Sequence, residues 1–229
     1  MSGMRTKSAL PYDAIFTYVY AVFRINLCLL AAGLPVVLAL AFTGSPLAAW
    51  PFFAGLSALC GPAVTAAFAA FDVMSEEPHR VGRAFWSGYR TGFTRSLKVA
   101  AVAAAAMIVL GVDLELAAGT AFRAAAPMLV LLIALVIAMT TAVLATGRRL
   151  PGPGLLACAY LSVRKWYLSL ANLVVLGVLL AAIVAKPALG LAVLPGPVLY
   201  VVWANARHIV SPLTTPLTST PTTTEARKG

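Results

Sequence analysis

The chain alternates between long apolar runs and short polar segments that are mostly basic. A helix needs about 20 apolar residues to cross the hydrocarbon core of a bilayer. Six runs reach or approach that length, and they cover about residues 15–42, 47–71, 97–116, 121–146, 167–185 and 187–206. The pattern therefore predicts an all-α protein, a polytopic transmembrane helical bundle of six spans within residues 15–210. Residues 1–14 are expected to form a short cytoplasmic N-terminus, and the Thr/Pro-rich residues 211–229 a disordered cytoplasmic tail.

Composition supports a membrane protein over a soluble one. Hydrophobic residues make up 61% of the chain and charged residues 10%, with a mean hydropathy of +0.93. Soluble domains carry about 25% charged residues, so lipid has to act as solvent for much of this surface. The net charge is +10, and the lysine and arginine residues that produce it lie mostly between the apolar runs and not on a separate basic domain. We therefore expect the chain to lie in a lipid bilayer, and we expect it not to bind nucleic acid.

The distribution of lysine and arginine predicts the topology. Fourteen of these residues fall on one side of the six-span arrangement and two, Arg123 and Lys186, on the other. Because cytoplasmic loops carry the excess of positive charge, both termini are expected inside, which requires an even number of spans. The first run is longer than the apolar core of a signal peptide. It is therefore read as a retained span of a multi-pass protein in the bacterial cytoplasmic membrane.

The segment between the second and third runs carries aromatic residues at helical spacing. Phe85, Tyr89 and Phe93 recur every four residues and share one face, while Arg83 and Arg90 occupy other positions. The pattern predicts an amphipathic cytoplasmic helix, either an anchor on the inner leaflet or a docking surface for another protein. Gly88 and Gly92 would weaken this helix unless another element packs against them.

Two polar residues interrupt the first run. Arg24 and Asn26 stand among apolar neighbours, and a charge at the centre of a span costs about 2.5–3.5 kcal/mol on insertion scales. Arg24 either snorkels or pairs structurally, with Asp13 and Asp72 as the nearest candidate partners, or it marks an intramembrane site or subunit contact. The sequence leaves both alternatives open.

Helix breakers occur in three of the runs. They are Pro35, Gly61 with Pro62, and the Pro-Gly-Pro segment at 195–197. Discontinuous spans line the sites of many transporters, usually at matching places in two repeats. Here the breaks do not fall at matching places, so kinks that serve helix packing are the default interpretation and a transport pathway the alternative.

Residues suited to catalysis do not form a recognisable group. The chain contains no GxxxxGK[ST], HExxH or GxSxG motif, and its cysteines lack CxxC spacing. Asp113 and Glu115 are two residues apart and point to different sides of a helix, as expected for a solvated helix end or an outward polar contact. We predict no enzyme activity, no cofactor and no metal site.

Four motifs together resemble a known family. The first run contains FRINLCLLAAGLP, the second ends in CGPAVTAAFAAF, the following loop contains AFWSGYRTGFTRSLK, and the third run closes in VDLEL. This order resembles the YesL-like family of small bacterial membrane proteins, a domain of unknown function. The likeness covers roughly residues 15–116, and the remainder agrees mainly in the layout of spans.

Members of that family are often encoded beside carbohydrate ABC importers, so the resemblance implies an accessory subunit that binds importer permeases and assists or regulates sugar uptake. A stand-alone transporter or channel and a structural or sensory protein are the alternatives, and self-association stays open. The candidate partner or intramembrane contacts are Arg24, Asn26, Pro35, Gly61, Pro62, Phe85, Tyr89, Arg90, Phe93 and Asp113.

Overall fold

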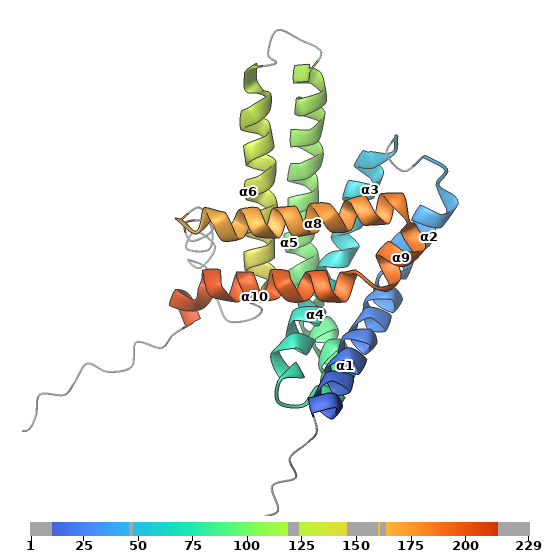
Figure 1. The fold of residues 1–229 in the computed structure, drawn as a ribbon. Coiled ribbons are helices and arrows are strands. Elements are labelled where there is room, and N and C mark those ends of the chain that lie inside the picture. Colours follow the sequence, from blue (N-terminus) through green and yellow to red (C-terminus); the bar gives the residue numbers. More distant parts are fainter. Residues whose placement is uncertain (1–10, 46–47, 119–123, 146–159, 161–163, 215–229) are drawn as a thin grey trace, which may run out of the picture.

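Helices form all of the regular structure in the part of the chain that the computed structural model describes, which is residues 11–45, 48–118, 124–145, 160 and 164–214. The predicted N-terminal segment 1–10 and most of the tail, 215–229, lie outside these ranges. Figure 1 shows the arrangement. The helices are α1 (Pro11–Ala32), α2 (Leu34–Phe42), α3 (Trp50–Leu56), α4 (Cys60–Met74), α5 (Val81–Ala118), α6 (Ala126–Ala145), α8 (Trp166–Ala185), α9 (Pro187–Ala192) and α10 (Pro195–Thr214).

Several of these helices are long and apolar enough to cross a membrane. Four stretches qualify by themselves: Trp50–Met74, Pro78–Ala117, Ala126–Ala145 and Trp166–Ala185. The pair α1 and α2 qualifies as a fifth if a bent pair counts as one span. The all-α prediction is therefore confirmed, and the helices are compatible with a multi-pass membrane protein.

The last predicted span, 187–206, is not among those candidates. It is divided into α9 and α10 by a break at residues 193–194. Moreover, the second half of α10 contains Asn205, Arg207 and His208. Because of the break and these polar residues, no uninterrupted apolar helix of span length forms there.

The first predicted span bends sharply. The axes of its two helices differ by 66° across Gly33. Pro35 follows directly, and a proline inside a continuous helix would lose the hydrogen bond to the carbonyl four residues earlier and clash with it. In the structure Pro35 instead occupies the first turn of α2, where no such bond is needed.

The third predicted span and the predicted amphipathic helix form one helix. α5 runs without a break for 38 residues, about 57 Å at 1.5 Å per residue, against about 30 Å for the hydrocarbon core. A separate helix on the leaflet surface is therefore not what the structure contains. Residues 81–98, which hold all the bases of α5, continue the axis of its apolar half.

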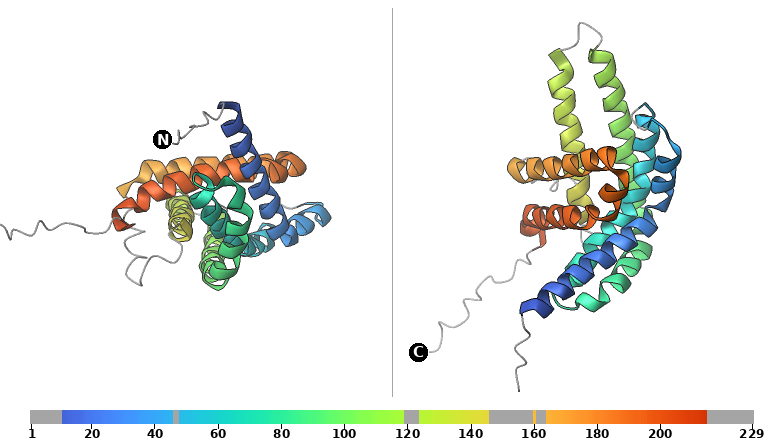
Figure 2. Two further views of the ribbon diagram at one scale, coloured as in Figure 1. Left: turned by 90° about the horizontal axis from the view of Figure 1, so that it is seen from below. Right: turned by 45° about the vertical axis from the view of Figure 1, so that its right-hand side comes forward.

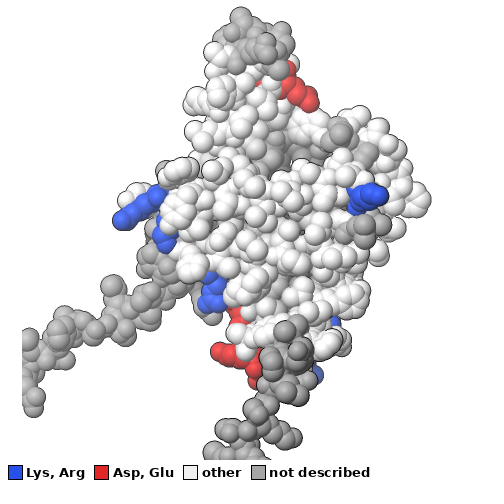
Figure 3. Space-filling view, in the orientation of Figure 1, with Lys and Arg blue, Asp and Glu red and all other residues white. Residues whose placement is uncertain are grey.

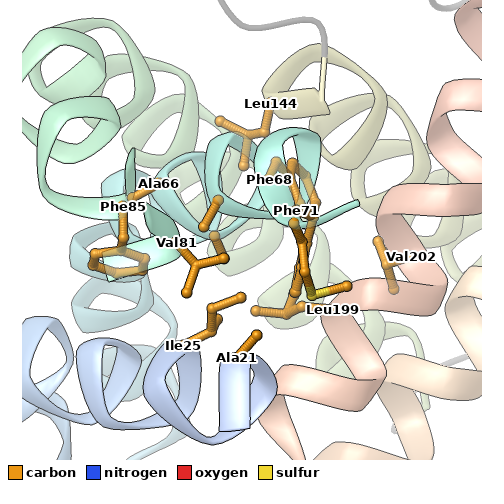
Figure 4. Packing of buried hydrophobic residues seen from close by; sticks show 13 residues of the cluster. Ala21, Ile25, Ala66, Phe68, Phe71, Val81, Phe85, Leu144, Leu199 and Val202 are labelled. Atoms are coloured by element: carbon orange, nitrogen blue, oxygen red, sulfur yellow. The ribbon is translucent and has the colours of Figure 1, made fainter. Parts of the chain in front are cut away.

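The main hydrophobic core lies around the start of α5 and not around its apolar end. Phe71 of α4, Phe85 of α5 and Ile25 of α1 are almost completely buried together with Val202 of α10. Figure 4 shows these side chains converging from separate helices. The core thus joins the first part of the chain to its last helix.

The helices do not share one axis. In Figures 1 and 2, α8 and α10 lie side by side and run crosswise to the paired α5 and α6. The side chains of α8 are mostly apolar and mostly exposed, with Val178 and Leu180 at 60% and 64%. Figure 3 shows few charged atoms on this face, which is the character of a surface facing lipid.

Candidate functional site

The first half of α5 has a packed face and an exposed face. Phe85 is fully buried, with Ile25 and Phe71 in the same cluster. The predicted role of Phe85 as a partner contact therefore has to be corrected, because the side chain is not accessible. The aromatic face of this helix points mainly into the protein, since α1 and α4 pack on it.

The exposed face is basic and regular. Arg83, Ser87, Arg90, Thr94 and Lys98 are all exposed and recur at intervals of three or four residues, which places them in one row along the helix. We call these five residues the basic stripe. It extends about 22 Å from Arg83 to Lys98 at 1.5 Å per residue. The sequence singled out Arg90 but did not distinguish this row from the other bases.

Aromatic side chains flank the basic stripe. Trp86 and Phe93 keep 40% and 37% of their surface exposed, whereas Tyr89 is half-buried between them. The ring centroids of Trp86 and Tyr89 are 5.6 Å apart, and those of Tyr89 and Phe93 are 5.4 Å apart. Of the aromatic residues predicted for docking, Phe93 is exposed and Tyr89 only supports it. Trp86 was missed because it is out of step with the four-residue spacing.

The charges of the stripe have no partner within the described chain. Among the described residues the ion pairs are Arg80 with Glu77 at 2.7 Å and Arg207 with Asp72 at 3.0 Å. Arg83, Arg90 and Lys98 belong to neither pair. The stripe therefore presents three positive charges that no acidic side chain of these residues neutralises.

Arg24 contacts the turn that precedes α5. Its Nη1 donates to the backbone oxygen of His79 at 3.1 Å, and its guanidinium lies 5.7 Å from the ring centroid of Tyr20. A Cβ on Gly82 would lie 2.7 Å from Arg24 Nη2. The structure thus gives Arg24 a structural pairing with the backbone. Its expected partner Asp72 binds other groups instead, and the side chain of Asp13 lies outside the described ones.

Asn26 bridges the break between α9 and α10. Its Nδ2 donates to the oxygen of Val193 at 2.9 Å, and its Oδ1 accepts from the Gly196 N–H at 2.6 Å. The side chain is 5% exposed. A helix break leaves backbone groups unpaired, and this amide satisfies one donor and one acceptor there. The sequence identified Asn26 but offered no partner 170 residues away.

Asp72 contacts the middle of α10. Its Oδ1 accepts from Trp203 Nε1 at 3.1 Å and from Arg207 Nη1 at 3.0 Å. The Arg207 guanidinium also lies 5.1 Å from the ring centroid of Trp203. This group was not predicted, because its members come from elements distant in sequence. Trp203 and Arg207 are four residues apart on one helix face, which is the only local signal.

A further polar pair joins α8 to α10. Asn205 Nδ2 donates to Asn172 Oδ1 at 2.9 Å. Asn172 is 2% exposed, and its Nδ2 has no hydrogen-bond partner. An unpaired buried donor is costly, so this pair is a weak point of the α8–α10 contact.

The predicted helix breaker at 61–62 lies in close contact with α5. Gly61 and Pro62 are both buried, and a Cβ on Gly61 would lie 2.5 Å from Ala100 Cβ and 2.9 Å from Ser96 O. A Cβ on Gly88 would likewise lie 2.9 Å from Ala69 Cβ. Glycine at both places lets the two backbones approach, so α4 is the element that packs against the glycines of α5.

The remaining predicted site lies at the opposite end of α5. Asp113 is exposed, whereas Glu115 accepts a hydrogen bond from Trp50 Nε1 at 2.7 Å. The two carboxylates therefore act separately. In the described part of the chain, no three His, Cys, Asp or Glu residues are placed to hold a metal ion.

Comparison of the chain with protein-family models, with curated proteins and with solved structures found no match. The function therefore has to be argued from the residues themselves. Among the sites above, Asn26, Asp72 and Gly61 make their contacts with other helices of the same chain. The basic stripe faces outward with three bases that belong to neither ion pair of the described residues.

Proposed function

We propose that the chain is an accessory subunit of a membrane transport complex that binds its partner through the first half of α5. The observation that carries the proposal is the basic stripe, a row of unpaired bases flanked by exposed Trp86 and Phe93. Exposed aromatic and arginine side chains are enriched at protein interfaces. The FRIN and AFWSGYRTGF motifs, through their resemblance to the YesL-like family, favour the permease of a carbohydrate ABC importer as the partner.

The proposed topology places both termini in the cytoplasm, with α9 and α10 together as the sixth span. The charge asymmetry of fourteen bases against two supports it. This topology puts the basic stripe on the cytoplasmic side of a bacterial cytoplasmic membrane. It also requires the α8–α10 pair to tilt toward the axis of α5 and α6 within the bilayer. Variants with a single cysteine at position 87 or 186 test the assignment. A thiol reagent that does not cross the membrane should label position 186 and not position 87 in intact cells.

The docking role is tested by purifying the tagged protein from its native membrane in mild detergent and identifying what accompanies it by mass spectrometry. Recovery of an importer permease with its ATPase is the expected result. The triple variant R83E/R90E/K98E should lose that partner. The triple variant R95E/R164E/K186E, which changes the net charge equally at exposed positions outside the stripe, should retain it. Retention of the partner by both variants would contradict docking through α5.

A second candidate function is transport by this chain itself. It is favoured by one observation: Asn26, about two turns before the 66° bend in the first span, also holds the break between α9 and α10. Discontinuous helices with free backbone groups are common in transporter sites. Solute flux through the purified protein in liposomes tests this alternative. Flux that is lost in Asn26→Leu, in a variant that remains folded, would favour transport over the accessory role.

A further inference from the structure

We infer that the element that docks on the basic stripe is an acidic amphipathic helix of the partner, lying alongside α5. The inference rests on the docking role proposed above and specifies its chemistry. Its starting point is the periodicity of the stripe. Arg83 and Arg90 are seven residues apart, and Arg90 and Lys98 are eight apart, so consecutive bases stand two helical turns, about 10–12 Å, from one another.

A second helix can match that spacing with side chains of its own. Glutamate or aspartate residues seven or eight positions apart return to the same face of an α-helix. Within the stripe, the bases are separated by Ser87 and Thr94. Their short hydroxyl side chains leave room for a neighbouring backbone. Apolar residues next to the acids would meet Trp86 and Phe93, which remain 40% and 37% exposed.

The direction of α5 argues against anionic lipid as the occupant. The stripe lies in the same unbroken helix as the apolar residues 99–112, so it continues the membrane-crossing axis instead of lying along the surface. A helix that binds headgroups lies in the plane of the interface. Only the Lys98 end can reach the headgroups, because Arg83 is about 22 Å further along the helix and electrostatic attraction is screened beyond about 8–10 Å.

The arrangement of the bases also favours binding of a helix over binding of an extended polyanion. Arg95 is exposed on the same helix, and at 3.6 residues per turn it lies about 140° from Arg90 and about 120° from Arg83, although it is about 60° from Lys98. An extended polyanion can use Arg95 as readily as the stripe. A helix aligned with the stripe cannot contact Arg95 and Arg83 on the same face. Arg95 therefore serves as an internal control for Arg83 and Arg90.

The experiment uses the purified full chain in nanodiscs of neutral lipid. The probe is a designed, fluorescent amphipathic helical peptide with three glutamates at spacings of seven and eight and leucines beside them. We expect saturable binding that weakens at least tenfold in R83E/R90E/K98E, and at least fivefold in the single variant R90E against less than twofold in R95E. A peptide with lysine in place of each glutamate should bind the triple variant and restore affinity.

Three results would overturn the inference. The first is equal binding of polyglutamate or of a peptide with the same residues in scrambled order, which would mean attraction of polyanions only. The second is binding that requires anionic lipid in the nanodisc. The third is binding unchanged by the triple variant, with thermal unfolding of that variant confirming that it is folded. Because the assay needs no native partner, it decides the inference even where co-purification finds no permease and the accessory role fails.

Discussion

The contact between α4 and α5 and the attachment of α10 to the rest of the chain are built from different kinds of interaction. The first brings two backbones together at Gly61 and Gly88, where a single added carbon would collide with the neighbouring helix. The second relies heavily on side-chain hydrogen bonds, from Asn26 at the start of α10 and from Asp72 at its middle. Both kinds of contact suit helices in a membrane, where lipid is as apolar as the side chains and helices associate through close packing and hydrogen bonds.

The difference has an energetic consequence. Close packing of small residues distributes its stabilisation over many weak contacts, so it fails when volume is added. A polar attachment concentrates its contribution in a few groups, and it fails when one partner is removed and the other stays buried. The two regions should therefore respond to opposite kinds of substitution.

The largest effect is expected for Asn26→Leu. The substitution leaves the buried Gly196 N–H and the part-buried Val193 carbonyl without their partner. Each unsatisfied group costs about 1–3 kcal/mol, so we expect a loss of about 3 kcal/mol in the free energy of unfolding, measured in mixed micelles. Thr43→Val, which removes a hydroxyl bonded only to the last turn of the adjoining helix α2, is the control. A loss no greater than that of Thr43→Val would show that Asn26 does not hold the break.

A somewhat smaller effect is expected for Gly61→Ala. The new Cβ would lie 2.5 Å from Ala100 Cβ and 2.9 Å from Ser96 O, and overpacking of this kind costs about 1–3 kcal/mol. We expect a loss of about 2 kcal/mol by the same measurement. Gly177→Ala is the matched control, because nothing lies within 4 Å of its added Cβ. It should be neutral or slightly stabilising, since alanine is the better helix former. Similar losses for the two would refute close packing at Gly61.

Asp72→Ala should cost less than either of these. It removes the acceptor of Trp203 and Arg207, but the Asp72 and Arg207 side chains are 44% and 51% exposed. Exposed ion pairs contribute about 0.2–1 kcal/mol because water and salt screen them, so we expect a loss of about 1 kcal/mol that shrinks at high salt. Glu76→Ala, at a nearby exposed position, is the control. A loss independent of salt would assign the effect to packing around Trp203.

The smallest change is expected for the double variant Asn172→Leu with Asn205→Leu. The pair shares one hydrogen bond and leaves Asn172 Nδ2 unpaired. Replacing both partners with apolar groups can be neutral or stabilising, so we expect a change between zero and a gain of about 1 kcal/mol. Either single variant should be less stable than the double. A double-mutant cycle checks the coupling, and a double variant less stable than both singles would contradict it.

Much of the architecture follows from local features of the sequence. Apolar runs of span length predicted the helical character, and Pro35 marked the place near which the first helix bends. The helical spacing of Phe85, Tyr89 and Phe93 predicted a helix there, and that helix is present. Its environment was not predicted, because periodicity shows that a face is apolar but does not show whether protein or lipid covers it.

The candidate sites were predicted only in part, because the sequence shows which residues are unusual but not what they contact. Arg24 and Asn26 stand out in any hydropathy profile, since a polar residue in an apolar run is expensive. Their partners, the backbone of His79 and the break before α10, are distant along the chain. Trp86, Ser87 and Thr94 gain significance only after the buried face of α5 is known, because the exposed row is defined by contrast with it.

By itself, the sequence determined what depends on composition and short-range spacing. These features are the apolar helices, the concentration of bases between them, and the polar residues that need partners. Only the tertiary structure decided that α5 continues unbroken from its basic half into its apolar half, that Phe85 faces the core, and that Asn26 reaches α10. Those outcomes depend on which helices pack together, and packing is a property of pairs of elements that no single stretch of sequence contains.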